Sequence, residues 1–372
     1  MSLRAVLFGE AISCTITGLL REGHPRNDSI KMKSEKISRR DFLKLSGLGL
    51  AGLFTPPLNF HFDDPFTDVL GRVTTRMIWM YDHPSSEATR VKFCQRDALL
   101  NITNTTISDD VTAHNRVWYE IGTDGFVYSG YVQPVRTILN TPRMDIPVNG
   151  LLTEISVPFT DAYETPDKTS KVAYRMYYET THWIKSVTTS EDGQVWYQVR
   201  DDKFDELYYA RAEHLRIMTE EELAPLSPYI PNTNKKIQVQ LDEQIMVAYE
   251  NDQPVFVAPI STGGIYRVGT YTTPKGSFIT YYKRPSRHMA AGDIAASGFD
   301  LAGVPWVQYI TESGISFHGT FWHNDFGRPH SHGCINLSMQ TAKWLYRWTS
   351  PQVSFNKEFS FGGVGTNVEI VL

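Results

Sequence analysis

Alternating apolar and polar residues dominate the C-terminal third of the chain. Ile237, Val239 and Leu241 fall on one face of an extended segment, the two-residue period of a half-buried strand. Residues 244–257 predict a second strand, a turn at Asn251–Asp252 and a returning strand. Because several strands follow one another with short turns, we expect a sheet here. Further strand-like runs are 276–282, 314–319 and 365–372.

One helix is predicted among these strands. Ser338 is a favourable N-cap residue. The apolar residues after it recur at helical spacing, namely Met339, Ala342, Leu345 and Tyr346. With one clear helix among many strand-like runs, residues 236–372 are predicted to form a mainly β domain.

Two similar segments precede this domain, and we place them at 68–140 and 150–220. The tripeptide VWY at 117–119 recurs at 195–197, a shift of 78 residues. Short alternating strands separated by Gly, Asp and Asn turns predict a small β-barrel in each segment. The same shift of 78 pairs Tyr131 with Tyr209.

The aromatic pattern of these segments resembles the bacterial SH3-like domain of cell-wall proteins. That resemblance implies a glycan or peptide ligand for each barrel. The alternative is a generic β domain in which Trp118 and Trp196 only fill the cores. Residues 221–235 are predicted to be a linker, because three prolines in it disfavour both helix and central strand: Pro225, Pro228 and Pro231.

The first 60 residues have the composition of an export leader. SRRDFLK at 38–44 is followed by the apolar run LSGLGLAGLF, which is too short to span a bilayer. This arrangement resembles a Tat-type signal and implies an extracytoplasmic protein that meets the membrane only through its signal. About thirty residues precede the signal, so we interpret Met32 as the true start and 1–31 as a misassigned extension.

Charge and cysteine usage narrow the functional classes. The net charge is −5, and residues 1–58 carry nine Lys/Arg against five Asp/Glu, so the remainder is strongly acidic. Such a body is a poor match for nucleic acid, whose binding requires clustered Lys and Arg. The three cysteines, Cys14, Cys94 and Cys334, do not form a disulfide pattern. We expect Cys94, on a strand-like run, to be a buried structural thiol.

Cys334 lies in a segment rich in histidine. His318, His323, His330 and His332 are four of the eleven histidines in the chain. A cysteine nucleophile reacts as the thiolate, which an adjacent imidazole generates by taking the proton as an imidazolium. His318 and His332 are both candidates for this base. We favour His318, because a residue on a neighbouring strand is better fixed in direction.

Gly333 suggests where a developing oxyanion would bind. Without a Cβ, it lets an acyl carbonyl approach the backbone, whose N–H groups at Gly333 and Cys334 are candidate donors. We expect Asn336 to hold the loop by hydrogen bonding.

The segment resembles the signature of the YkuD-type L,D-transpeptidase catalytic domain. That signature is a histidine, a spacer and then Ser/Thr-His-Gly-Cys-hydrophobic-Asn. The resemblance also covers 261–264, 273–278 and the closing strand. The twelve-residue spacer is short and contains HNDFGRPH, which we expect to alter donor or acceptor choice. The residues that match the signature are His318, Ser331, His332, Gly333, Cys334, Ile335 and Asn336.

The resemblance implies a β-sandwich and a reaction on peptidoglycan stem peptides. Cys334 would attack the bond before the D-alanine at position four, and an amine acceptor would resolve the acyl-enzyme as a 3-3 cross-link or a protein attachment. His318 would move the proton, Gly319 would orient it through its carbonyl, and His332, Ser331 and Asn336 would shape the cleft. No metal or other cofactor is implied.

Three alternatives stay open on the sequence alone. The histidines and Cys334 are competent zinc ligands, although their spacings do not match the common zinc sites. The second alternative is a non-catalytic wall-binding protein. The third is an L,D-carboxypeptidase or amidase that uses water as acceptor. A hydrophobic lid would favour transfer over hydrolysis, and Trp322, Phe326 and Trp344 are candidates for it. We place Arg287 and His288 in a loop.

Overall fold

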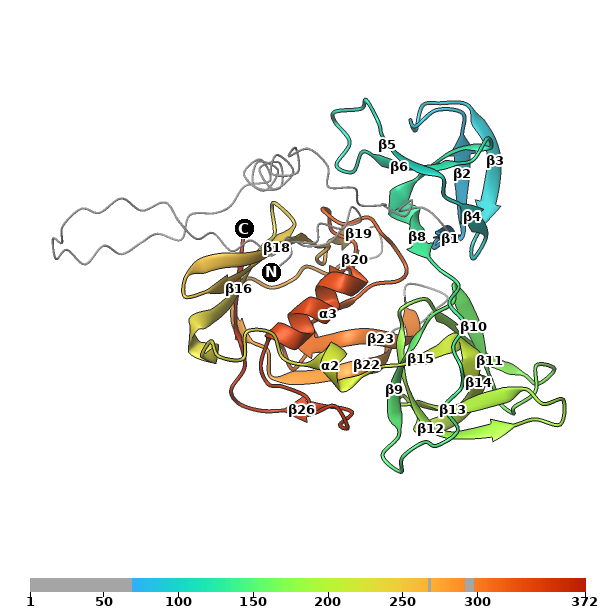
Figure 1. Cartoon of the computed structure of the whole chain (residues 1–372). Coiled ribbons are helices and arrows are strands. Elements are labelled where there is room, and N and C mark those ends of the chain that lie inside the picture. Colours follow the sequence, from blue (N-terminus) through green and yellow to red (C-terminus); the bar gives the residue numbers. More distant parts are fainter. Residues whose placement is uncertain (1–68, 267–268, 292–297) are drawn as a thin grey trace, which may run out of the picture.

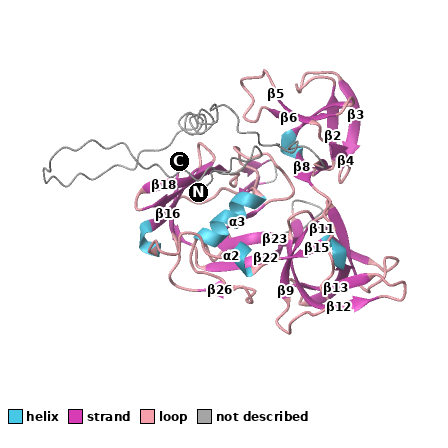
Figure 2. Ribbon diagram, in the orientation of Figure 1, coloured by secondary structure: helices cyan, strands magenta, loops and turns pink. Residues whose placement is uncertain are grey.

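The computed structural model describes residues 69–266, 269–291 and 298–372 (Figure 1). The predicted Tat-type signal and the predicted start at Met32 lie outside the described residues. Over those described, the chain is mainly β, with the two α-helices α2 and α3 (Figure 2). Neither of these helices has the length and apolarity needed to cross a membrane. The chain builds a first β unit, a second β unit and a C-terminal domain (Figure 1).

The first β unit consists of residues 69–135. Its strands lie in two sheets, with the orders β4-β1-β8 and β3-β2-β7-β6-β5. Cys94 is buried in its core, as predicted. The strands are β1 (Leu70–Val73), β2 (Met77–Tyr81), β3 (Arg90–Gln95), β4 (Leu99–Asn101), β5 (Asn104–Ile107), β6 (Val117–Ile121), β7 (Gly125–Tyr128) and β8 (Val132–Val135).

The second β unit consists of residues 151–217. It is one seven-stranded sheet of order β11-β10-β14-β13-β12-β9-β15. Its strands are β9 (Leu151–Ile155), β10 (Phe159–Tyr163), β11 (Val172–Tyr177), β12 (Thr181–Thr189), β13 (Val195–Asp201), β14 (Glu206–Arg211) and β15 (Leu215–Ile217).

The two β units repeat the same local structure. Tyr81 meets Trp118 edge-on at 5.6 Å between ring centroids, and Tyr163 meets Trp196 edge-on at 5.6 Å. In each unit a 3₁₀ turn precedes the last strand, at Ser129–Tyr131 and at Ala212–His214. The described strands close no barrel in either unit, so the SH3-like assignment stays a prediction.

The register of the repeat differs from the prediction. Trp118 pairs across its sheet with Tyr128, and Trp196 pairs with Arg211. Tyr131 therefore corresponds to His214, the last residue of the equivalent 3₁₀ turn, and its predicted match with Tyr209 is wrong. The physical reason is that β13 and β14 are longer than β6 and β7, so a fixed shift of 78 fails after the turn between them.

The predicted linker begins with the short helix α2 (Glu220–Leu223). Thr219 accepts a hydrogen bond from the Glu222 backbone N–H, and the Glu222 side chain accepts one from the Thr219 backbone, which is a complete capping box. Leu223 and Leu226 pack against the core of the C-terminal domain. The segment is thus bound to the domain that follows it.

The C-terminal domain contains two five-stranded sheets and the helix α3 (Met339–Trp348). The first sheet has the order β18-β17-β16-β27-β21 and the second β25-β24-β23-β22-β26. Two short strands, β19 (Ile265–Tyr266) and β20 (Gly269–Thr270), form a separate pair. The other strands are β16 (Lys235–Gln240), β17 (Ile245–Glu250), β18 (Gln253–Pro259), β21 (Gly276–Ile279), β22 (Tyr282–Ala291), β23 (Phe299–Tyr309), β24 (Ser316–Gly319), β25 (Ile335–Leu337), β26 (Ser360–Phe361) and β27 (Asn367–Val371).

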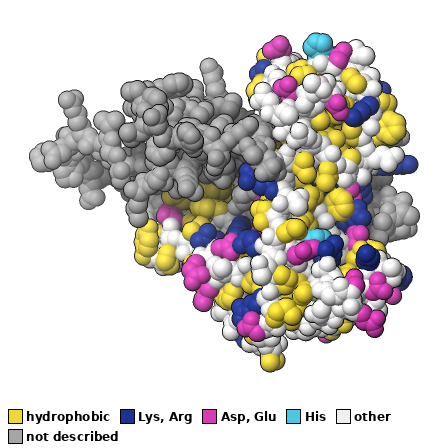
Figure 3. Space-filling model, turned by 45° about the vertical axis from the view of Figure 1, so that its right-hand side comes forward, with side chains coloured by type: hydrophobic (Ala, Val, Ile, Leu, Met, Phe, Trp, Pro, Cys, Tyr) yellow, Lys and Arg dark blue, Asp and Glu magenta, His cyan; other side chains and the backbone are white. Residues whose placement is uncertain are grey.

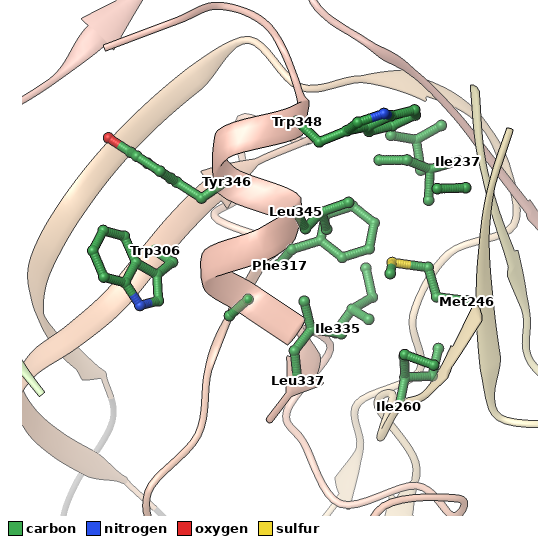
Figure 4. Close-up of a cluster of buried hydrophobic side chains, with 14 of the residues drawn as sticks. Ile237, Met246, Ile260, Trp306, Phe317, Ile335, Leu337, Leu345, Tyr346 and Trp348 are labelled. Atoms are coloured by element: carbon green, nitrogen blue, oxygen red, sulfur yellow. The ribbon is translucent and has the colours of Figure 1, made fainter. Parts of the chain in front are cut away.

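The local predictions for this domain are confirmed. Asn251 and Asp252 both have positive φ, at 50° and 61°, and join β17 to β18. The Ser338 hydroxyl accepts a hydrogen bond from the Thr341 N–H at the start of α3. Helix α3 then places Leu345 among buried side chains from both sheets (Figure 4).

The second β unit shares this core. Leu152, Trp183 and Met218 belong to the same buried cluster as the side chains of the two C-terminal sheets. The predicted linker therefore separates the second β unit from the C-terminal domain along the chain, although the two share one buried core.

One predicted loop is a strand. Arg287 and His288 lie in β22, where Arg287 binds Asp202 and His288 Nδ1 contacts Asp201 Oδ2 at 2.6 Å. The prediction failed because the partners are carboxylates of the second β unit, about 85 residues earlier in the chain. These charges bind the unit to the domain.

Candidate active site

Two adjacent parallel strands position the predicted catalytic pair. In β24 and β25, His318 pairs with Asn336 and Phe317 pairs with Ile335. Since successive side chains of a strand alternate between faces, Phe317 and Ile335 enter the core while His318 and the residue before β25, Cys334, share the other face. Figure 4 shows the core side of this arrangement.

The Cys334 thiol lies against the start of β24. Its sulfur is 3.7 Å from Ser316 Oγ and 3.8 Å from the Gly314 carbonyl oxygen. Burial raises the pKa of the Cys334 thiol, and hydrogen bonds from the backbone and side chain of Ser316 offset part of that rise. Ser316 is therefore the group that stabilises a thiolate here.

His318 is 3% exposed, and its Nδ1 lies 3.1 Å from the Gly319 carbonyl oxygen. Burial lowers the pKa of His318 to about 4, although the Gly319 carbonyl acts in the opposite direction. The neutral ring donates its Nδ1 proton to this carbonyl, which leaves the Nε2 lone pair free to accept a proton. The Gly319 contact expected from the sequence is thus present.

Burial shifts the pKa values of both groups toward their neutral forms, raising that of the Cys334 thiol and lowering that of His318 to about 4. Among the described residues, no hydrogen bond joins the His318 ring to the Cys334 sulfur. The thiolate–imidazolium pair expected from the sequence stays a prediction.

The loop before Cys334 is closed by a serine. The Ser331 hydroxyl donates to the Cys334 carbonyl at 2.5 Å and accepts from the Gly333 N–H at 3.1 Å. The Gly333 N–H is therefore occupied, whereas the Cys334 N–H has no partner in the described part of the chain. Of the two oxyanion donors predicted, this conformation leaves Cys334 N–H available.

Gly263 and Thr273, from two earlier segments of the chain, hold the loop before Cys334 in place. The Thr273 hydroxyl accepts from the Gly263 N–H at 2.9 Å and donates to the Gly333 carbonyl at 2.8 Å. A Cβ on Gly263 would lie 1.9 Å from the Tyr271 carbonyl oxygen and 2.7 Å from Gly333 Cα, so only glycine fits. Gly333 itself has φ +116°.

Asn336 makes contacts through both its backbone and its side chain. Its N–H and carbonyl pair with Ser261 at 2.8 and 3.0 Å. Its buried side-chain amide instead contacts His323 Nε2 at 3.0 Å. These contacts join β25 to Ser261 and to His323, and the predicted hydrogen bond from Asn336 to the loop before Cys334 stays a prediction.

His332 is exposed and surrounded by aromatic rings. Its ring centroid lies 4.5 Å from that of Tyr271, 6.0 Å from Tyr266 and 6.0 Å from Phe299. These rings, and not the catalytic pair, are its ring neighbours among the described residues.

The candidate lid residues separate into two groups. Trp344 stacks on Phe256 at 3.8 Å in the core and is not a lid. Trp322 lies beside the His318 ring at 5.6 Å, and Phe326 lies beside His323 at 5.1 Å. These two rings are near the catalytic pair.

The loop 323–330, which we call the histidine loop, binds the first β unit. Asp325 is fully buried and accepts hydrogen bonds from the Tyr128 hydroxyl at 2.7 Å and from His330 Nε2 at 3.1 Å. It also contacts His114 Nε2 at 2.7 Å and pairs with Arg328. The unusual charge of this segment therefore serves as a clamp between the two parts of the chain.

The remaining two histidines of the segment, His323 and His330, belong to this loop. His323 is buried and stacks on His330 at 4.4 Å. Burial holds the pKa of His323 well below its usual range. Within the described ranges, no three His, Cys, Asp or Glu side chains converge to hold a metal ion.

Sequence reasoning missed four residues that build this site. Ser316 was detectable, because it lies two residues before His318 on an alternating strand and therefore on the same face. Thr273, Gly263 and Asp325 lie in segments that the resemblance or its spacer included, but nothing in the sequence indicated their individual roles, since their partners are distant in the chain.

The C-terminal domain is similar to known proteins. Residues 234–370 match the family model of the L,D-transpeptidase catalytic domain, YkuD. Over 130 residues, or 32% of this chain, the sequence is 28% identical to YciB of Bacillus subtilis (strain 168), whose own assignment as an L,D-transpeptidase is provisional. The match spans 63% of that protein, less than two thirds of its length.

Solved structures match over the same share of the chain. An L,D-transpeptidase from Mycobacterium smegmatis is 24% identical with a TM-score of 0.30, covering 37% of this chain and 58% of the other. The catalytic domain of the E. faecium L,D-transpeptidase is 22% identical with a TM-score of 0.28, covering 37% and 95%. The family match covers residues 234–370, which include both His318 and Cys334.

Proposed function

We propose that this protein is a peptidoglycan L,D-transpeptidase with Cys334 as its nucleophile. The observation that carries the proposal is the placement of Cys334 and His318 on one face of two adjacent parallel strands. This pair lies within the residues that match the catalytic family.

The burial of both groups supports an attack coupled to proton transfer. His318 Nε2 takes the thiol proton as the sulfur attacks the carbonyl before the D-alanine at position four of a stem peptide. Coupling avoids a separated ion pair in a buried site, where charged groups are poorly solvated. The Cys334 N–H is placed to stabilise the oxyanion, and Ser316 stabilises the sulfur.

Two steps then complete the reaction. The protonated His318 returns its proton to the leaving amine of D-alanine, and a thioester remains on Cys334. The amine of a neighbouring stem, or of a tethered protein, then attacks this thioester and loses a proton to His318. The product is a 3-3 cross-link or a protein attachment, and the thiol is regenerated. The energy comes from the bond that is cleaved, so the mechanism uses no cofactor.

An aromatic ring beside the base favours an amine acceptor over water. Trp322 lies beside the His318 ring at 5.6 Å between ring centroids, so apolar surface borders the base. An apolar wall disfavours ordered water there.

We also propose that the protein acts outside the cytoplasm after export by the Tat pathway. The twin arginines at 39–40 and the apolar run after them support export. The proposed substrate supports the same location, because peptidoglycan lies outside the membrane.

The test is incubation of the purified protein with tetrapeptide muropeptides, followed by mass analysis of the products. Cross-linked dimers are expected from the wild type and none from Cys334→Ala or His318→Ala. A carbapenem should add its mass to Cys334. Cys94→Ala is the matched control, because it removes the other described thiol and should retain activity. Released D-alanine without dimers would contradict transfer, and an unmodified Cys334 in folded wild type would contradict the proposal.

A further inference from the structure

A cavity lies on the first β unit, outside the catalytic site. Its volume is about 380 Å³, within the range of small-ligand sites. Strand β2, the loop before β6, the 3₁₀ turn and the histidine loop all contribute to its wall. We call it the aromatic groove after the rings that line it, which are Trp79, Tyr81, Trp118, Tyr128 and Tyr131.

The rings of the aromatic groove support one another. Tyr81 meets Trp118 at 5.6 Å, Trp118 meets Tyr128 at 5.7 Å, and Tyr128 meets Tyr131 at 5.4 Å, all edge-on. Edge-on packing fixes ring orientation. The groove is therefore a preformed aromatic surface. The face that carries both β units otherwise shows hydrophobic, acidic and basic side chains interspersed (Figure 3).

Trp118 supplies a hydrogen-bond donor without a partner. The side chain is 5% exposed and lines the groove, and no described residue accepts a hydrogen bond from its indole N–H. This nitrogen is not among the buried polar atoms without a partner, so it remains accessible from the groove. In the second β unit the equivalent Trp196 donates its indole N–H to Ser190 at 2.9 Å. The first unit thus offers a ligand a donor that the second unit uses internally.

In the second β unit, the positions equivalent to Trp79 and Tyr128 carry charged side chains that form ion pairs. The strand position of Trp79 is taken by Asp161, which binds Arg175 at 2.8 Å. The position of Tyr128 is taken by Arg211, which pairs with Glu213. Aromatic surface at these positions is thus a property of the first unit and not a requirement of the repeated fold.

The groove has no free cation for an anionic ligand. Of the residues that line it, His114 and Arg328 are the basic ones, and both are held by Asp325. The acidic lining residue, Asp110, accepts hydrogen bonds from Thr112 in its own turn. Rings that pack on apolar C–H faces, beside an indole N–H and phenol hydroxyls, match a neutral ligand rich in hydroxyl and amide groups.

We propose that the aromatic groove binds a neutral saccharide with N-acetylated amino-sugar rings. The site is continuous with the clamp of the histidine loop, since His114, Tyr128 and Arg328 belong to both. A glycan bound here lies next to the loop that carries His323 and contacts Asn336. The proposal rests on the peptidoglycan function proposed above, because the same polymer carries the stem peptides.

The test is calorimetric titration of the full chain with chitotetraose, a neutral oligomer of N-acetylglucosamine. The Cys334→Ala background removes turnover, so binding is measured apart from catalysis. Trp79→Ala and Tyr81→Ala should each weaken binding by about tenfold or more, as expected for losing one ring from a stacked site. Tyr163→Ala is the matched control, because Tyr163 makes the same edge-on contact with Trp196 in the second unit.

Several other outcomes would overturn the proposal. The proposal is overturned if folded protein does not bind chitotetraose, or if Tyr163→Ala weakens binding as much as Tyr81→Ala. It is also overturned if a sugar-free stem peptide binds in place of chitotetraose and depends on Tyr81. Melting curves of each variant identify misfolding, and Tyr81→Phe, which keeps the ring, should retain most of the affinity. A carbapenem adduct on Cys334 with no saccharide binding would refute this proposal alone.

Discussion

The clamp at Asp325 makes a strong prediction about how the first β unit is held. Asp325→Asn keeps the shape of the side chain but replaces one carboxylate oxygen by an NH₂ group. In the structure both oxygens accept hydrogen bonds, from Tyr128 and His114 on one side and from Arg328 and His330 on the other. If the NH₂ group turns toward Arg328, it faces a side chain that can only donate. If it turns toward Tyr128 and His114, both hydrogen bonds to that oxygen are lost unless those groups change from donor to acceptor.

The size of the effect follows from burial. Asp325 is fully buried, and removing one partner of a fully buried ion pair costs about 3–5 kcal/mol. The Arg328 and His330 side chains are 40% and 26% exposed, so water can solvate them in the variant. We therefore expect a loss of about 2–3 kcal/mol in the free energy that holds the first unit in place.

The pKa of Asp325 predicts how the stability difference between wild type and Asp325→Asn changes with pH. Burial alone would raise the pKa of Asp325, but hydrogen bonds from His330 and Tyr128 and the charge of Arg328 hold it below its ordinary value. A carboxyl whose pKa is lower in the folded state contributes stability above its unfolded pKa of about 3.9. This contribution is lost as the pH falls below about 4. The difference between wild type and variant should shrink there.

Urea unfolding and hydrogen exchange measure this prediction. Amides of residues 114–131 should exchange faster in Asp325→Asn at neutral pH, and the unfolding midpoint should fall. Asp124→Asn is the control, because its ion pair with Lys92 is about half exposed and should matter little. Equal protection of 114–131 in wild type and Asp325→Asn would refute the clamp.

Three further predictions concern the catalytic pair and its support. Ser316→Ala should move the alkaline rise of carbapenem acylation to higher pH, because Ser316 lowers the pKa of Cys334; an unchanged pH–rate profile would contradict this. Gly263→Ala should abolish cross-linking and lower the melting temperature, because its Cβ would lie 1.9 Å from the Tyr271 carbonyl oxygen. In the free enzyme, kcat/KM should persist down to about pH 4 and fall below it, because burial lowers the pKa of His318 to about 4 and only its neutral form accepts a proton; an acid limb near pH 6.5 would contradict it.

Local rules were sufficient for much of the C-terminal domain. The helix at 339–348 follows from Ser338 and the apolar spacing after it, and the hairpin at Asn251–Asp252 follows from turn chemistry. Both depend on neighbours within a few residues. The same holds for the choice of His318 and Cys334 as the candidate pair, because the signature around them is short and continuous except for one spacer.

Long-range contacts were outside the reach of such rules. Arg287 and His288 read as a polar loop, yet their partners are carboxylates of the second β unit. The repeat was visible, but its register shifted because strands of unequal length change the offset between equivalent residues. Trp118 and Trp196 are both buried, while only Trp196 has a partner for its indole N–H.

The sequence by itself predicted the strands, the helix and the candidate catalytic pair, Cys334 and His318, since periodicity, capping and a contiguous motif are local properties. Only the tertiary structure shows that burial disfavours charge on both groups. It also decided that one oxyanion donor is free, because the Ser331 hydroxyl takes the other. The clamp at Asp325 and the aromatic groove join residues about 200 positions apart, and only packing brings them together.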